Sequence, residues 1–191
     1  MPEAVVDHRR ATAERNAAAI LDAASRLLER GASLNMRAIA TEAGVSRPTL
    51  YAHYPTITDV VEAVIERAVR NSVASMEAAR PASGPAVEAL ERVAAASWGQ
   101  LAQFSSMAAG AREHVSTAAV HRAHAPIRGY VLDLAARGQA EGAFRTDMPA
   151  DWLMTMYFAL VHAAADHVSE HRMKRDDALA LLQMSLRDLF T

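Results

Sequence analysis

The sequence predicts an all-α fold of about nine helices. Apolar residues recur every three or four positions along almost the whole chain, and no sustained strand-like alternation interrupts them. Hydrophobic residues make up 51% of the 191, which is enough to bury a sizeable core. The first residues lack the apolar segment of a secretory signal, and no apolar run approaches the roughly 18 residues that a membrane span needs. We therefore expect a soluble, cytoplasmic protein.

Capping residues and glycines divide the first half of the chain into helices. Asn35 and Ser46 are suited to accept hydrogen bonds from the free amides at the start of a helix. Gly31 suits the left-handed conformation that follows a helix end. These signals and the apolar stripes predict a helix that ends at Gly31, helices over 36–43 and 47–53, and a longer helix, capped by Thr56 or Thr58, that ends near Ala79.

The segment 80–85, Arg-Pro-Ala-Ser-Gly-Pro, is the one clear break in composition, and we take it as a domain boundary. The helices expected beyond it are a region from Val87 to Gly110, a short helix over 111–119, and helices over 125–140, 149–171 and 174–190. The predicted organisation is a small N-terminal domain over 1–57, a connector helix over 58–80 and a larger helical domain over 81–191.

The charge and the cysteine content of the chain exclude few classes of function. The formal net charge is −2, and the first sixty residues balance at about zero, so no strong basic field marks a polyanion partner. Lys174 is the only lysine. Arginine, which supplies the other cations, offers the bidentate contacts to phosphate and guanine that lysine does not. Without cysteine there is no disulfide framework and no thiolate chemistry.

Residues 38–55, AIATEAGVSRPTLYAHYP, place two short predicted helices on either side of a tight turn that contains a glycine. This is the arrangement of a helix-turn-helix, whose second helix reads the major groove with the side chains of its N-terminal half. Leu50 is expected to point away from that surface and to hold the second helix against Ile20 and Ile39.

The second helix of this motif carries side chains suited to DNA. Ser46 offers a hydroxyl beside free amides, which makes a phosphate anchor. Arg47 and Thr49 can reach base edges or phosphates. Tyr51 and His53 can donate hydrogen bonds to the DNA backbone. A single tyrosine or histidine at a helix end is more often a half-buried or solvated residue, so the prediction rests on the whole set.

Residues 36–64, MRAIATEAGVSRPTLYAHYPTITDVVEAV, resemble the DNA-binding domain of the TetR family of transcriptional regulators. Ile39-Ala40, Ala43 to Ser46 and Thr49 to Pro55 stand at the spacing of that family, and the preceding ILDAASRLLERG agrees with it. The resemblance covers about residues 12–70. It implies contacts to operator DNA from Arg37, Ser46, Thr49, Tyr51, His53 and Tyr54, and it places Arg47 and Pro48 at positions that vary with the operator sequence.

The chain departs from the family pattern at Ile57, where many members carry a lysine. One phosphate contact is therefore either absent or supplied by Arg9, Arg10 and Arg15. These three arginines are equally consistent with a solvated arm that does not touch DNA.

The resemblance also implies a homodimer that forms through the last two helices. The residues expected at that interface are Leu153, Leu160 and Ala164 on the first helix and Leu182, Leu186 and Leu189 on the second. The larger domain is expected to enclose a small-molecule pocket that is mainly apolar, given its methionine and aromatic content. The candidate lining residues are Trp98, Leu101, Phe104, Met107, His121, His124, Tyr130, Leu134, Trp152, Met156, Tyr157 and His162.

We expect a repressor that leaves a palindromic operator when a small molecule binds. A regulator that needs its ligand to bind DNA, or that has none, remains an alternative, as does a helical protein-interaction module. No enzyme or cofactor is expected, because the chain lacks a Gly-rich phosphate loop, a cysteine nucleophile, a Gly-x-Ser-x-Gly elbow and a His-Glu-x-x-His pair. His167 and His171 are four residues apart on a predicted helix, but no third metal ligand accompanies them.

Overall fold

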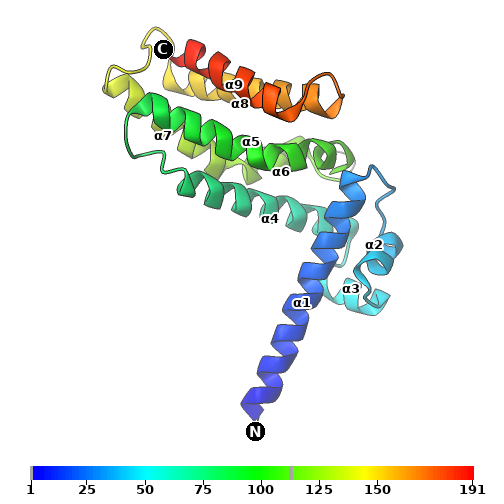
Figure 1. Cartoon of the computed structure of the whole chain (residues 1–191). Helices are drawn as coiled ribbons and strands as arrows, with labels where there is room; N and C mark the ends of the chain where they lie inside the picture. The colour runs from blue at the N-terminus through cyan, green and yellow to red at the C-terminus, as the bar shows by residue number, and fades with distance from the viewer. Residues whose placement is uncertain (1, 112–113) are drawn as a thin grey trace. The chain divides into compact units, whose positions relative to one another are not determined.

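A computed structural model describes residues 2–111 and 114–191, without the side chains of 2–9, 100–111, 117, 120 and 121. This described part forms nine helices and no strand, which confirms the all-α prediction (Figure 1). The helices are α1 (Pro2–Glu29), α2 (Met36–Ala43), α3 (Arg47–His53), α4 (Ile57–Ala78), α5 (Ala86–Ala111), α6 (Thr117–Ala123), α7 (Ala125–Ala140), α8 (Ala150–Ser169) and α9 (Arg175–Phe190). No helix in these ranges is long and apolar enough to cross a membrane.

The start of α4 is fixed by Thr56. The Thr56 hydroxyl accepts a hydrogen bond from the amide of Asp59 at 3.2 Å, and the Asp59 carboxylate accepts one from the Thr56 amide at 2.8 Å. This reciprocal pair satisfies two amides that a helix start leaves free. Thr56, rather than Thr58, is therefore the cap. The Thr58 hydroxyl instead donates to the carbonyl oxygen of His114 at 3.3 Å.

The helix predicted over 111–119 is wrong. α5 runs past Gly110 to Ala111, and the next helix, α6, begins only at Thr117. Residues 112 and 113 lie outside the described part of the chain. Gly110 thus lies one residue before the end of α5, close to the predicted end of that helix, and the error concerns where the following short helix begins.

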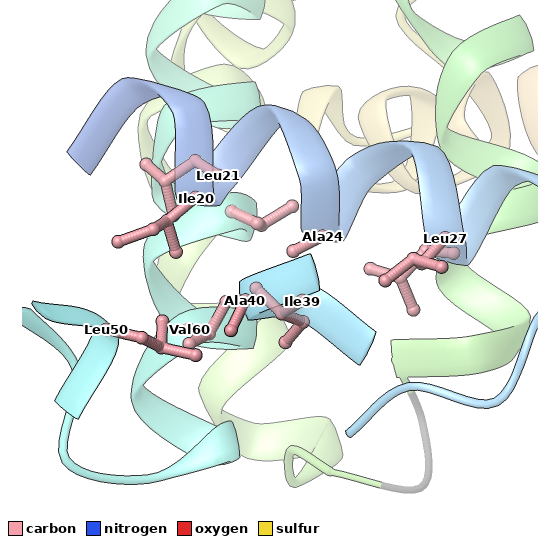
Figure 2. Close-up of a cluster of buried hydrophobic side chains, with 10 residues drawn as sticks. Ile20, Leu21, Ala24, Leu27, Ile39, Ala40, Leu50 and Val60 are labelled. Carbon is pink, nitrogen blue, oxygen red and sulfur yellow. The ribbon is translucent and has the colours of Figure 1, made fainter. Parts of the chain in front are cut away.

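The chain divides into two compact units. Unit 1 comprises Met1–Glu66 and Ser106–Thr117, and unit 2 comprises Arg67–Ser105 and Ala118–Thr191. The core of unit 1 joins its first helices through buried aliphatic side chains, which point toward one another in Figure 2. The buried members of this core are Ile20, Leu21, Ala24, Leu27 and Leu28 from α1, Ile39 and Ala40 from α2, Leu50 from α3, and Val60 and Val64 from α4. The expected packing of Leu50 with Ile20 and Ile39 is thus confirmed.

In unit 2, α8 packs against both α7 and α9. Tyr157 and Phe190 are the largest of its fully buried side chains. The rings of Phe190 and Phe144 meet edge to face, with centroids 5.1 Å apart. Phe144 in turn lies directly against Gly138 of α7, where a side chain would overlap the Phe144 ring. Gly138 is therefore required for the close approach of this ring to α7.

Two arginines hold the loop between α4 and α5. Arg92 donates from Nε to the carbonyl oxygen of Ala79 at 2.9 Å and from Nη2 to that of Ser83 at 2.6 Å. Arg137 donates from Nη2 to the carbonyl oxygen of Pro81 at 2.9 Å and from Nη1 to that of Gly84 at 3.0 Å. The guanidinium groups thereby satisfy loop carbonyls that no helix pairs.

We predict that Gly138→Ala lowers the free energy of unfolding by about 1–3 kcal/mol, because the new methyl group must displace the buried Phe144 ring. Gly129→Ala on the same helix is the matched control. Its methyl group meets open space, so the gain in helix propensity should raise the free energy of unfolding by about 0.5–1 kcal/mol. Urea denaturation of both variants measures the difference. Equal effects of the two substitutions would contradict this packing.

Candidate nucleic-acid interface

Gly44 makes the tight turn between α2 and α3. Its φ of 67° lies in the left-handed region, where glycine carries no steric penalty. The amide of Gly44 donates to the carbonyl oxygen of Thr41 at 3.3 Å, and that of Val45 donates to Ala40 at 3.1 Å. These two bonds close α2 in the manner of a Schellman motif, so the direction in which the chain enters α3 is set locally.

Ser46 begins α3. Its hydroxyl oxygen accepts a hydrogen bond from the Thr49 amide at 3.2 Å and lies 2.7 Å from the Thr49 hydroxyl. Pro48 follows in the first turn, where its missing amide hydrogen costs nothing. Ser46 as the cap and residues 47–53 as the helix were both predicted, and both are confirmed. The Ser46 and Pro48 side chains are exposed, and the start of α3 therefore presents its amides at the protein surface.

α3 has one buried and one exposed face. Leu50 is completely buried, whereas Tyr51, the next residue, is 44% exposed. His53 and Thr49 are partly buried. Tyr54, at the end of the helix, is partly buried and packs against the apolar core of unit 1. The exposed face offers a phenol, hydroxyls and an imidazole, all of which are hydrogen-bonding groups.

Arg37 and Arg47 are the two arginines of the helix-turn-helix, which comprises α2 and α3. Both side chains are exposed. Among the described residues, neither one has an ion-pair or hydrogen-bond partner. Exposed guanidinium groups without a partner in the protein are able to bind phosphate or guanine.

Other arginines of unit 1 have partners within the protein. Arg26 and Arg30 pair with Glu42 at 2.9 and 3.0 Å, which joins α1 to α2. The hydrogen bonds from Arg26 and Arg30 lower the pKa of the Glu42 carboxyl. These two arginines are therefore less available to an external anion.

The N-terminal arginines lie in α1 rather than in an irregular arm. Arg10 pairs with Glu14 at 3.1 Å, and Arg15 donates to the Thr12 hydroxyl at 2.8 Å. Arg10 and Arg15 are both exposed, and the side chain of Arg9 lies outside the described part. An exposed ion pair of this kind is weak, so it does not prevent contact with DNA.

The residues predicted to line a ligand pocket fall into several environments, and all of them except Met107 belong to unit 2. Trp98, Leu134 and Tyr157 are buried, whereas Trp152 and His162 are exposed on α8. His124, Tyr130 and Met156 are partly buried. The side chains of Leu101, Phe104, Met107 and His121 lie outside the described part.

Tyr130 and His162 already have partners. The Tyr130 hydroxyl donates to the Glu77 carboxylate at 2.6 Å, and this hydrogen bond raises the pKa of Tyr130. The Nδ1 atom of His162 lies 2.6 Å from the carbonyl oxygen of Phe158, so Nδ1 is the donor of that bond. Tyr130 thus links α7 to α4.

The residues predicted for a dimer interface differ in their exposure. Leu153, Leu182 and Leu186 are buried in the interior of the single chain, which leaves them almost no surface for a second copy. Leu160, Ala164 and Leu189 are partly buried. The large apolar side chains exposed on α8 and α9 are instead Trp152, Leu181 and Met184, at 53, 44 and 54%. The helical spacing of apolar residues did not distinguish the buried faces of α8 and α9 from their exposed faces.

His167 and His171, the two histidines considered as a metal pair, do not lie on the same helix. α8 ends at Ser169, and His171 follows in the left-handed region with a φ of 57°. The described part of the chain contains no group of three or more side chains able to hold a metal ion.

We predict that Ser46→Ala lowers the free energy of unfolding by about 0.5–2 kcal/mol, because the Thr49 amide loses its capping oxygen. Ser46→Asp retains a capping oxygen and adds a negative charge at a helix N-terminus, so its stability should match or exceed that of the wild type. Thermal and urea denaturation measure both variants. A loss of stability in Ser46→Asp equal to that in Ser46→Ala would contradict the capping role.

Comparison with known proteins supports the assignment of this segment. Residues 20–64 match the family model of bacterial regulatory proteins of the tetR family. The HTH-type transcriptional repressor LfrR of Mycolicibacterium smegmatis is 41% identical over 80 residues. That alignment covers 42% of this chain and 42% of the relative, so it spans less than half of either protein.

Solved structures extend the likeness to most of the chain. The TetR-like regulator LfrR from Mycobacterium smegmatis, in complex with proflavine, has a TM-score of 0.69 and 25% identity, covering 93% of this chain and 97% of its own. Two FadR regulators share the fold at lower identity. That of Bacillus halodurans has a TM-score of 0.78, 16% identity and coverage of 89% of this chain and 93% of its own.

The second FadR, from Bacillus subtilis in complex with stearoyl-CoA, has a TM-score of 0.75 at 17% identity. Its alignment covers 90% of this chain and 95% of its own. The matched segment and the shared helical fold agree: residues 20–64 are similar to the TetR family of bacterial regulatory proteins, and most of the chain shares the helical fold of TetR-like regulators.

Proposed function

We propose that the protein is a homodimeric transcriptional repressor that binds a palindromic operator and is released by a small molecule. The observation that carries this proposal is that α3 has two different faces. Leu50 lies on the buried face, and the exposed face presents hydrogen-bonding side chains to solvent. The domains that we assign to these tasks are residues 1–57 for DNA, 58–80 as a connector, and 81–191 for ligand binding and dimerisation.

The contacts to DNA are assigned by side-chain chemistry. Arg37 and Arg47, which are exposed and have no partner in the described chain, bind phosphate or guanine. Tyr51 donates its exposed hydroxyl to a phosphate oxygen. The amides at the start of α3 bind a second phosphate beside Ser46. Thr49, Pro48, His53 and Tyr54 complete the contact surface at its edges.

The dimer interface is assigned to a surface on α8 and α9 that we call the α8–α9 face, comprising Trp152, Leu181 and Met184. These are large apolar side chains in solvent, on two helices that lie side by side in Figure 1. Exposed apolar surface of this kind marks an interaction site. A palindromic site requires two reading heads related by a two-fold axis, so a second copy is the occupant that fits this face.

The effector is assigned to the interior of unit 2. Trp98, Leu134 and Tyr157 supply a mainly apolar surface there. The related LfrR and FadR structures contain proflavine and stearoyl-CoA, which supports a ligand-responsive role without identifying this ligand. Release from DNA requires that the ligand bind one conformation of the dimer more tightly than the other.

Selection of duplexes from a random DNA pool by the ligand-free protein should enrich a two-fold symmetric site. Thr49→Ala with Tyr51→Ala should weaken binding to that site by about tenfold or more, because hydrogen bonds to DNA are lost. Tyr51→Phe removes only the hydroxyl and should reproduce part of this loss with unfolding free energy unchanged.

Ser46→Asp is the complementary variant, since it keeps the helix cap but places a negative charge beside the DNA phosphates. It should weaken DNA binding while it remains folded. Enrichment of no symmetric site by the ligand-free protein would contradict the proposed repressor. Unimpaired binding by both the double variant and Ser46→Asp would exclude α3 as the reading helix.

Leu181→Glu with Met184→Glu should convert the dimer to a monomer, because two charges per subunit would have to be buried at the interface. We expect the dissociation constant to rise by about 100-fold or more in sedimentation equilibrium. Ala125→Glu with Ala136→Glu adds the same charge at exposed positions of α7 and is the matched control. A monomeric wild type, or a dimer that survives the α9 substitutions, would contradict this interface.

A further inference from the structure

The exposed residues of α3 form one continuous strip along the helix. Successive residues of an α-helix are turned by about 100°. At that spacing the exposed positions of α3 span about 140° of its circumference, and the buried Leu50 and the partly buried positions occupy the rest. We call this surface the α3 strip, and its members are Arg47, Pro48, Tyr51 and Ala52.

Arg47 is the member of the α3 strip that has several donors in one plane. Its guanidinium group has no ion-pair or hydrogen-bond partner among the described residues. Tyr51 has a single hydroxyl group, and Pro48 and Ala52 have no hydrogen-bonding group in their side chains. The partly buried Thr49 already shares a hydrogen bond of 2.7 Å with the helix cap. A contact from α3 that uses two parallel donors must therefore come from Arg47.

The apolar members of the α3 strip indicate that it lies against base edges rather than against the phosphate backbone. The side chains of Pro48 and Ala52 cannot donate to a phosphate oxygen, and both are short enough to let the helix approach the base pairs closely. The thymine methyl is an apolar group that the major groove presents to such side chains. In a helix-turn-helix, base edges are contacted by the N-terminal half of the second helix, where Arg47 lies.

We propose that Arg47 binds one guanine in each half-site of the operator. Guanine presents two acceptors, O6 and N7, on its major-groove edge, and the planar fork of an arginine matches this pair. The α3 strip has no Asn or Gln to pair with adenine and no Asp or Glu to accept from cytosine. This inference rests on the proposed operator-binding function, and it specifies a base pair of the operator.

The first test uses the duplex that the full-length protein enriches from a random pool. Each base pair of one half-site is replaced in turn, and the dissociation constants of the wild type and of Arg47→Ala are measured at one salt concentration. We expect one G·C pair whose replacement weakens binding of the wild type by about tenfold or more. Arg47→Ala should bind the original duplex more weakly and should lose its base preference at that pair alone.

The second test changes a single atom of the DNA. 7-Deazaguanine has a carbon in place of N7 and still pairs with cytosine. At the G·C pair identified above, it should weaken binding of the wild type by about fivefold or more and leave the affinity of Arg47→Ala unchanged.

Two further variants separate base reading from loss of charge. Arg47→Lys retains the charge but not the planar fork, so it should lose most of the preference for this guanine while it keeps most of the affinity. Arg37→Ala removes the same charge from another exposed position of the helix-turn-helix and is the matched control. It should retain the preference at this G·C pair. Because both arginines are exposed, urea denaturation should give each variant an unfolding free energy close to that of the wild type.

The proposal is overturned if Arg47→Ala weakens binding to all of these duplexes by the same factor, or if 7-deazaguanine has the same effect on both proteins. Arg47 would then be a phosphate contact, and enrichment of a two-fold symmetric site would still support the repressor. Failure to enrich any sequence would overturn both proposals, because a base-reading arginine must favour some sequences over others. An Arg47-dependent guanine in an asymmetric site would support this inference and contradict the palindromic operator.

Discussion

The reading surface depends on the burial of Leu50. α3 has only seven residues, and a helix of that length is not stable in water by itself. Leu50 is completely buried in the core that includes Ile20 and Ile39, and this apolar contact holds α3 in place. Because successive residues of a helix are turned by about 100°, fixing Leu50 inward turns Tyr51 away from the core, and Arg47, in the first turn of the helix, is exposed as well. A core contact thus determines which side chains face an operator.

The two units satisfy their polar groups in different ways. In unit 1 the turn glycine, the Ser46 cap and the Thr56 cap satisfy the amides and carbonyls at helix ends locally. In unit 2, Arg92 and Arg137 reach across helices to satisfy the loop between α4 and α5. Two buried side-chain nitrogens of the described part, Trp98 Nε1 and Arg137 Nε, have no partner within the protein.

Local chemistry determined which features could be predicted from sequence. The bounds of α2 and α3 follow from caps and a left-handed glycine that act over a few residues. Gly110 lies one residue before the observed end of α5, whereas the short helix predicted over 111–119 begins only at Thr117. The helical spacing of apolar residues correctly predicted α9. It did not distinguish the buried face of α9, which carries Leu182, from the exposed face, which carries Met184, because both faces are apolar. The pairing of Ser97 with Tyr157, distant in sequence, had no sequence signal at all.

The most direct test of the reading surface is amide chemical-shift mapping of ¹⁵N-labelled protein titrated with the selected symmetric duplex. The account predicts that the largest perturbations fall at Arg37 and over residues 46–54, with the amides of Ser46 to Thr49 shifted by the nearby phosphates. These chemical-shift perturbations should decrease as the salt concentration is raised, because contacts to phosphate weaken with salt. Perturbations confined to α8 and α9, with α3 unchanged, would contradict the central claim that α3 reads DNA.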